Sequence, residues 1–151
     1  MKIKTLILTI AMVLATASQV KASGPVLDGK YLMELKIGDR IFIDHLDLQG
    51  MEGAIHLRTF NGGIAGAITV PGIFTAPLSG QANCSESSSS CELNFVINAY
   101  EGGKYYKVFY QAELTNENYL RALSGKFPPV LTGTASLEDG QLLGPFEAIK
   151  Q

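Results

Sequence analysis

The chain has 151 residues, of which 46% are hydrophobic, and its 12 basic and 14 acidic residues leave a net charge of −2 at pH 7. This length is that of one ordinary domain. The acidic balance, without any basic cluster, argues against nucleic acid and anionic membrane surfaces as partners.

Residues 1–22 have the pattern of a cleavable secretory signal peptide. A short basic head precedes an uncharged, mostly apolar stretch at 5–17, and Val20 and Ala22 then occupy the −3 and −1 positions of a cleavage site. A transmembrane anchor is the alternative, but a spanning helix needs about 20 apolar residues. We therefore expect an exported protein, periplasmic or extracellular, without stable membrane insertion, whose single domain spans 23–151.

The rest of the chain predicts an all-β domain. Turn signals recur about every ten residues, and apolar residues alternate with polar ones between them. We expect an antiparallel up-and-down meander of about nine strands, closing into a barrel of eight to ten strands, because the connections are too short for parallel crossovers. A two-sheet sandwich is the alternative. An outer-membrane barrel is disfavoured because one face of each hairpin is polar.

The first hairpin has a Gly-Asp turn at 38–39 between strands at 30–37 and 40–48. In this register the apolar side chains of both strands share one core-facing side, where Asp44 also points inward, opposite Met33. A buried carboxylate without a partner is unfavourable. We interpret Asp44 either as a polar contact for a ligand inside the barrel, or as part of a bulge or barrel end that meets solvent.

Three more strands are predicted before the first cysteine. A strand at 53–60 is followed by a turn at 61–63 (Asn-Gly-Gly), and strands at 64–70 and 73–82 flank a Pro-Gly turn. Glycines inside strands are typical of the sharp bends of a small barrel, and four of them fit this pattern: Gly66, Gly80, Gly133 and Gly144.

Cys84 and Cys91 are the only cysteines, and the residues between them are polar. In an exported protein an even number of cysteines predicts a disulfide. Two free thiols are the alternative, and a metal pair is less favoured because no histidine is near either cysteine in the sequence.

The second hairpin has a Gly-Gly turn at 102–103 between strands at 91–100 and 104–115. Its core-facing side is apolar, but its other side also carries apolar residues. Cross-strand aromatic pairing explains part of this pattern, and an exposed contact surface for a homodimer or a protein partner is the other interpretation. The expected surface consists of Val96, Tyr100, Tyr105 and Phe109.

An irregular segment at 116–129, with a helical turn or a short strand at 119–123, precedes the last hairpin. An Asp-Gly turn at 139–140 joins strands at 131–138 and 141–150. The predicted register sets three pairs of residues opposite each other: Leu137 and Leu142, Leu131 and Ala148, and Gly133 and Phe146.

His45, Asp47 and His56 are the only residues that resemble a metal or acid–base cluster. Two histidines and a carboxylate can bind zinc, but outward polar residues of a β-meander have the same appearance. We expect no catalytic residue, no metal and no cofactor.

Gly29-Lys30-Tyr31 resembles the Gly-x-Trp motif that opens the first strand of lipocalins, with Tyr in place of Trp. The succession of short strands and Gly-rich turns is similar to avidin-like barrels, and both families belong to the calycin group. The resemblance implies a calycin-like barrel whose open mouth or interior holds a small ligand. Because the chain has no Trp, and avidins line the biotin pocket with Trp, biotin binding is not implied.

These observations predict an exported, non-enzymatic binding protein that holds a small apolar or amphipathic ligand in its barrel. A protein-interaction module, such as an inhibitor or an assembly subunit acting through the aromatic surface, is the alternative. A hydrolase or metal enzyme is the least favoured. The residues expected to contact the ligand are Tyr31, Met33, Phe42, Asp44 and Tyr110.

Overall fold

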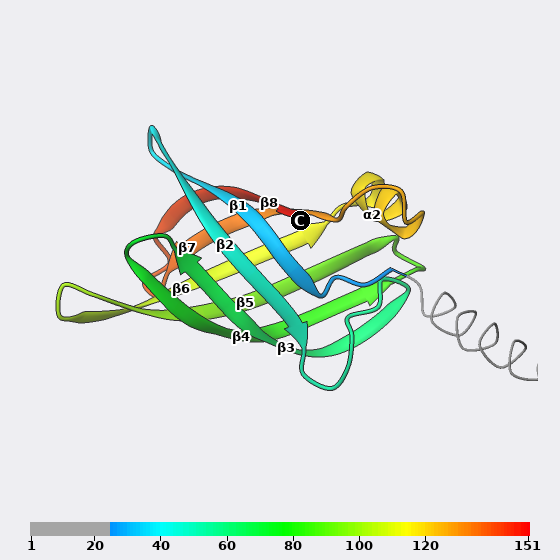
Figure 1. The fold of residues 1–151 in the computed structure, drawn as a ribbon, viewed down its shortest axis with the longest axis horizontal. Coiled ribbons are helices and arrows are strands. Elements are labelled where there is room, and N and C mark those ends of the chain that lie inside the picture. The colour runs from blue at the N-terminus through cyan, green and yellow to red at the C-terminus, as the bar shows by residue number, and fades with distance from the viewer. Residues whose placement is uncertain (1–24) are drawn as a thin grey trace, which may run out of the picture.

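From Gly29 the chain runs up and down through eight strands, each hydrogen-bonded to the next, and the last strand pairs with the first (Figure 1). The computed structural model describes residues 25–151, so the signal peptide predicted at 1–22 lies outside the described residues. Helix α2 (Asn116–Leu123) connects the sixth and seventh strands. The strands are β1 (Gly29–Ile37), β2 (Arg40–Gly50), β3 (Thr59–Val70), β4 (Phe74–Ser85), β5 (Ser90–Glu101), β6 (Lys104–Leu114), β7 (Val130–Leu137) and β8 (Leu142–Lys150). The predicted all-β antiparallel barrel of eight to ten strands is confirmed.

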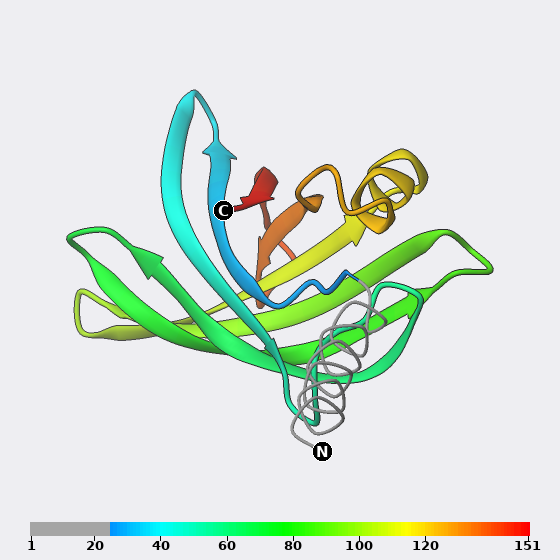
Figure 2. The ribbon, with the colours of Figure 1, turned by 45° about the vertical axis from the view of Figure 1, so that its right-hand side comes forward.

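The two ends of the barrel are built differently (Figures 1 and 2). The turns of four hairpins, β1–β2, β3–β4, β5–β6 and β7–β8, lie at one end, which we call the open end. The β2–β3 loop, the β4–β5 turn and helix α2 lie at the other, which we call the closed end.

The first two predicted hairpin registers are confirmed. Met33 pairs with Asp44 across β1 and β2, and Val96 pairs with Phe109 across β5 and β6. Because successive side chains of a strand point to opposite faces, Asp44 faces the interior and Phe109 faces outward. Helix α2 also confirms the helical interpretation of 119–123.

The last hairpin departs from the predicted register near its turn. Gly133 pairs with Phe146 as expected, but a bulge follows, and Ser136 pairs with Leu142. The predicted pairing of Leu137 with Leu142 is therefore wrong. The extra residue, Leu143, changes which side chains of β8 face the interior at the open end. Leu143 is half-buried there, and Leu142 is exposed.

The segment between β2 and β3 is a loop, so the strand predicted at 53–60 is wrong for 53–58, and only its last two residues belong to a strand, β3. Among the described residues, the only β-bridge of this loop joins Val26 and His56. The turn predicted at 61–63 is also wrong, since these residues lie inside β3 and pair with β4. A Cβ at Gly63 would lie 2.8 Å from the sulfur of Met51, an exposed and flexible side chain.

The strands approach one another closely at the predicted strand glycines. A Cβ added at Gly80 would lie 2.0 Å from the carbonyl oxygen of Asn94, and one at Gly133 would lie 1.9 Å from that of Gln111. No side chain fits in such a gap, which is why glycine occupies positions where a small barrel bends.

The predicted disulfide is confirmed. Cys84 and Cys91 are cross-strand neighbours on β4 and β5, with their Cα atoms 4.0 Å apart, and both are buried at the closed end. The disulfide joins β4 to β5 at the end of the barrel where helix α2 also lies.

Candidate ligand-binding site

Side chains from outside the strands fill the closed end of the barrel. Leu27, Ile55 and Leu57 are fully buried there, together with Tyr119 of helix α2. The Tyr119 hydroxyl donates a hydrogen bond of 2.8 Å to the Leu57 carbonyl oxygen. Helix α2 and the β2–β3 loop thus hold each other in place over this end.

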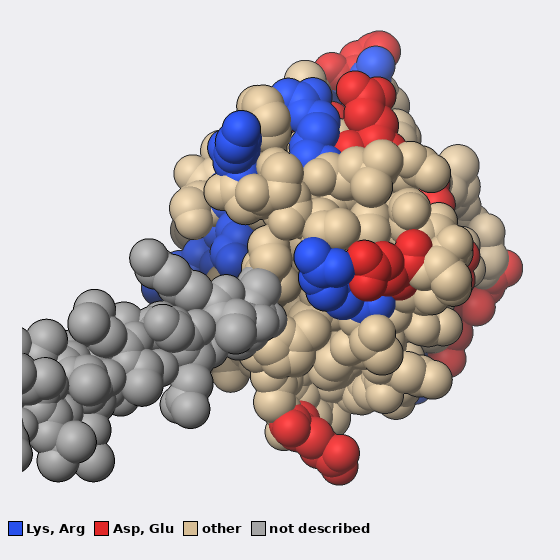
Figure 3. All heavy atoms as spheres, turned by 90° about the vertical axis from the view of Figure 1, so that its right-hand side faces the viewer, with Lys and Arg blue, Asp and Glu red and all other residues tan. Residues whose placement is uncertain are grey.

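Asp28 fixes the same loop from the N-terminal side. Its two carboxylate oxygens accept hydrogen bonds from the backbone N–H groups of Ile55, at 2.5 Å, and Gly50, at 3.1 Å. Figure 3 views this end, where basic and acidic side chains are scattered among uncharged residues. The closed end therefore combines a packed apolar interior with a rigid backbone cover.

The open end is hollow. A cavity of about 440 Å³ lies inside the barrel there, within the size range of small-molecule sites. Almost all of its fourteen lining residues are aliphatic or aromatic: Leu35, Ile37, Phe42, Asp44, Val70, Ile73, Phe74, Ile97, Ala99, Tyr106, Val108, Tyr110, Leu137 and Leu143.

Among the residues whose side chains the structure describes, Asp44 is the only charged one that lines this cavity. It is 3% exposed, and its Oδ1 has no hydrogen-bond partner among the described residues. Burial raises the pKa of the Asp44 carboxyl to about 6, and the neighbouring His45 offsets this only in part. At neutral pH the group is therefore a carboxylate in an apolar wall.

Tyr110 is held rigidly beside Asp44 in the same wall. Its ring stacks on Phe95, with centroids 5.0 Å apart and planes 9° apart, and meets the Phe146 ring edge-on at 5.6 Å. Burial and the negative charge of Asp44 both raise the pKa of Tyr110. Its hydroxyl therefore stays protonated and offers a hydrogen-bond donor.

The five residues expected to contact a ligand fall into two groups. Phe42, Asp44 and Tyr110 line the cavity. Tyr31 and Met33 do not, because they are buried in the packed core, where the Tyr31 hydroxyl donates a hydrogen bond of 2.6 Å to the Leu27 carbonyl oxygen. The alternating pattern correctly predicted that all five side chains face the interior. It carries no information on how far along the barrel the packed core extends.

Much of the cavity wall near the opening was missed in the sequence, including Val70, Phe74 and Leu143. One usable signal was present. Large apolar residues follow the turns of the hairpins, where polar residues are usual, and Ile41, Ile73 and Leu142 are all exposed. Of these three, only Ile73 lines the cavity, whereas Ile41 and Leu142 pair with Lys36 and Ser136 and lie on the outer side of the barrel.

The aromatic surface expected on β5 and β6 lies on the outside of the barrel. Tyr100 and Tyr105 are 56% and 80% exposed, and their ring centroids are 4.8 Å apart. Phe109 is 39% exposed, and its cross-strand partner Val96 is half-buried. Cross-strand pairing thus accounts for the two tyrosines, while Phe109 offers apolar surface to solvent.

His45, Asp47 and His56 do not form a centre. His45 and Asp47 are on the outer side of β2, whereas His56 is in the β2–β3 loop. Within residues 25–151, no group of three or more His, Cys, Asp or Glu side chains is placed to hold a metal ion.

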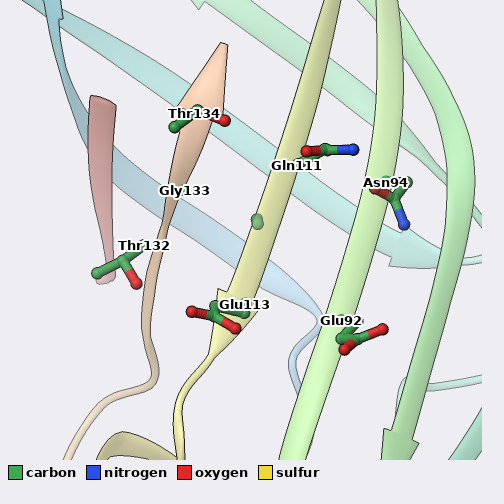
Figure 4. A pocket seen from close by; sticks show the side chains of 8 residues that line it. Glu92, Asn94, Gln111, Glu113, Thr132, Gly133 and Thr134 are labelled. Carbon is green, nitrogen blue, oxygen red and sulfur yellow. The ribbon is translucent and has the colours of Figure 1, made fainter. Parts of the chain in front are cut away.

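A second hollow, of about 490 Å³, lies on the outer face of β5, β6 and β7 above Gly133 (Figure 4). Glu92 and Glu113 face each other there on neighbouring strands. Its lining is polar, and its side chains are mostly exposed. This hollow is a groove in a polar surface, whereas the cavity at the open end has a mostly apolar lining.

Compared with known proteins, the chain matches no family model, no curated protein and no solved structure. In the part of the chain that the structure describes, no helix has the length and the apolar content needed to cross a membrane.

Proposed function

We propose that this protein is an exported, non-enzymatic binding protein that holds a small apolar or amphipathic ligand in the open end of its barrel. The observation that carries this proposal is the cavity of about 440 Å³, whose wall is apolar except for Asp44 and the tyrosine hydroxyls. A well-formed apolar pocket with a few convergent polar groups is the usual form of a small-molecule site.

Three features support the proposal. The Cys84–Cys91 disulfide fits an oxidising compartment, periplasmic or extracellular, as the predicted signal peptide requires. The eight-stranded closed barrel has the architecture of the calycin group, to which we assign the domain by analogy of fold. Ile73, which is exposed at the open end and also lines the cavity, offers an apolar ligand a contact where it enters.

A cavity-filling variant tests this function. The fluorescence of N-phenyl-1-naphthylamine, an uncharged apolar probe, is titrated against the purified domain at 23–151 and two variants. Val108→Trp fills the cavity from β6, and Val96→Trp adds the same ring to the outer face of β5 as a control. Circular dichroism first establishes that both variants keep the strand spectrum.

We expect saturable micromolar binding by the parent and by Val96→Trp, and at least tenfold weaker binding by Val108→Trp. The proposal fails if the parent does not bind the probe saturably. It also fails if Val108→Trp, with its fold intact, binds the probe as tightly as the parent.

We propose a protein-interaction module as a second candidate, favoured by the exposure of Phe109 and Tyr105. Aromatic side chains are enriched at protein interfaces. Native mass spectrometry of the purified domain is expected to show a homodimer in this case, and replacement of Tyr105 and Phe109 by Ser is expected to dissociate it. A mass spectrum that shows only the monomer at every protein concentration contradicts self-association through this surface.

A further inference from the structure

The charge inside the cavity is unbalanced. Among the fourteen described lining residues, Asp44 is the only carboxylic acid, and none is Lys, Arg or His. Within the described residues Asp44 takes part in no ion pair, since the recorded pairs are Arg58–Glu86 and Arg121–Glu117, both on the surface. The cavity therefore presents a carboxylate without a protein counter-ion.

We propose that the ligand is an organic cation, with a protonated amine on an apolar body, and that Asp44 binds the ammonium group. This inference rests on the proposed function and specifies the chemical class of the ligand. A buried charge is stable only when it is paired and hydrogen-bonded. Because Oδ1 of Asp44 has no donor, an ammonium N–H supplies the bond and the charge that the protein does not.

The walls of the cavity fit the same chemistry. Phe42, Phe74, Tyr106 and Tyr110 contribute aromatic rings to the lining. Aromatic faces attract cations, and this attraction is strongest where water is excluded. The aliphatic part of the wall then receives the apolar body of the ligand.

The same arrangement disfavours fatty acids, although they are also amphipathic. A fatty-acid carboxylate that enters beside Asp44 meets a like charge in a medium of low polarity, with no lysine or arginine in the lining to neutralise either group. An alcohol of equal length avoids this repulsion, but it forms only a neutral-donor hydrogen bond with Asp44.

Three ligands of equal chain length separate these cases: decylamine, decanol and decanoic acid. Each compound is titrated as a competitor against N-phenyl-1-naphthylamine bound to the domain at pH 7.5. The concentration of each compound is kept below that at which it aggregates. The test uses the parent, Asp44→Asn and Asp47→Asn, which makes the same change on the outer side of the same strand as a matched control.

We expect the parent and Asp47→Asn to bind decylamine at least tenfold more tightly than decanol, and decanoic acid most weakly. Asp44→Asn is expected to keep its affinity for decanol within about threefold and to lose the preference for the amine. The inference is overturned if the acid binds as tightly as the amine, or if Asp44→Asn retains the amine preference.

The failure of this inference differs from the failure of the proposed function. Binding of decanol and decylamine with equal affinity overturns the assignment of an organic cation and leaves the cavity as a ligand site. If none of the three compounds displaces the bound probe, the cation assignment is rejected, whereas the binding function is rejected only if the parent does not bind the probe saturably or Val108→Trp binds it equally well.

Discussion

Met33 and Asp44 are direct partners across β1 and β2, and together they mark the level at which the barrel interior changes from packed to hollow. Met33 is fully buried in the core, whereas Asp44 lines the cavity. The next inward-facing pair toward the open end, Leu35 and Phe42, also lines the cavity. The Asp44 carboxylate thus lies at the inner end of the cavity, next to the packed core.

Asp44 makes the stability of the empty protein depend on pH. Its folded pKa of about 6 lies above the ordinary value of 3.8, so the folded state holds the proton more tightly, and the free energy of unfolding falls as pH rises from about 4 to about 6. Asp44→Asn removes this loss. We therefore expect the free energy of unfolding of Asp44→Asn, relative to that of the parent, to rise by up to about 3 kcal/mol between pH 4 and pH 7.

Urea unfolding of both proteins at pH 4 and pH 7 measures this difference. Asp47→Asn is the control, and its stability relative to the parent is expected to change little with pH. A stability difference between Asp44→Asn and the parent that is the same at both pH values contradicts the buried, partnerless state of Asp44.

The bond between Tyr119 and Leu57 is expected to stabilise the closed end. Tyr119→Phe removes the donor and leaves the Leu57 carbonyl oxygen buried without its partner, which costs about 1–3 kcal/mol. Tyr105→Phe, at a hydroxyl on an exposed side chain, is expected to change stability by less than about 0.5 kcal/mol. Equal urea midpoints for the two variants would show that helix α2 is not anchored in this way.

The close approach of β6 and β7 at Gly133 is expected to tolerate no side chain. Gly133→Ala places a Cβ against the Gln111 carbonyl oxygen, so we expect a loss of more than about 2 kcal/mol or a failure to fold. Gly62→Ala is the matched control, because its Cβ would meet the movable Phe60 ring at 3.3 Å. Thermal unfolding compares the two, and a similar midpoint for both would contradict the strand geometry at Gly133.

Local sequence signals predicted much of this fold. The turns at 38–39 and 102–103 each combine a turn-forming pair with alternating apolar residues on both sides, so register and inward face follow together. The inward direction of the Asp44 side chain was predicted from this register alone. Residues 61–63 misled the same logic, because glycine is a turn signal that also occurs inside strands, and here these residues pair with β4.

The cavity was predicted less completely than the fold. Alternation distinguishes inward from outward side chains, but the depth of the packed core depends on how the closed-end segments insert, as Tyr119 and Leu57 do. The bulge at Leu143 also changes which leucines face the cavity, and no periodic signal marks it. These features depend on long-range packing, which a local pattern does not record.

The most direct test of the account is an NMR titration of the ¹³C-methyl-labelled domain with decanol. If the open end holds the ligand, saturable shifts appear at Leu35, Val70 and Leu137, which line the cavity, while the fully buried Leu27 and Leu57 at the closed end stay unchanged. Shifts that are largest at the closed end or at Val96 on the outer face, or the lack of any saturable shift, would contradict a ligand site inside the barrel.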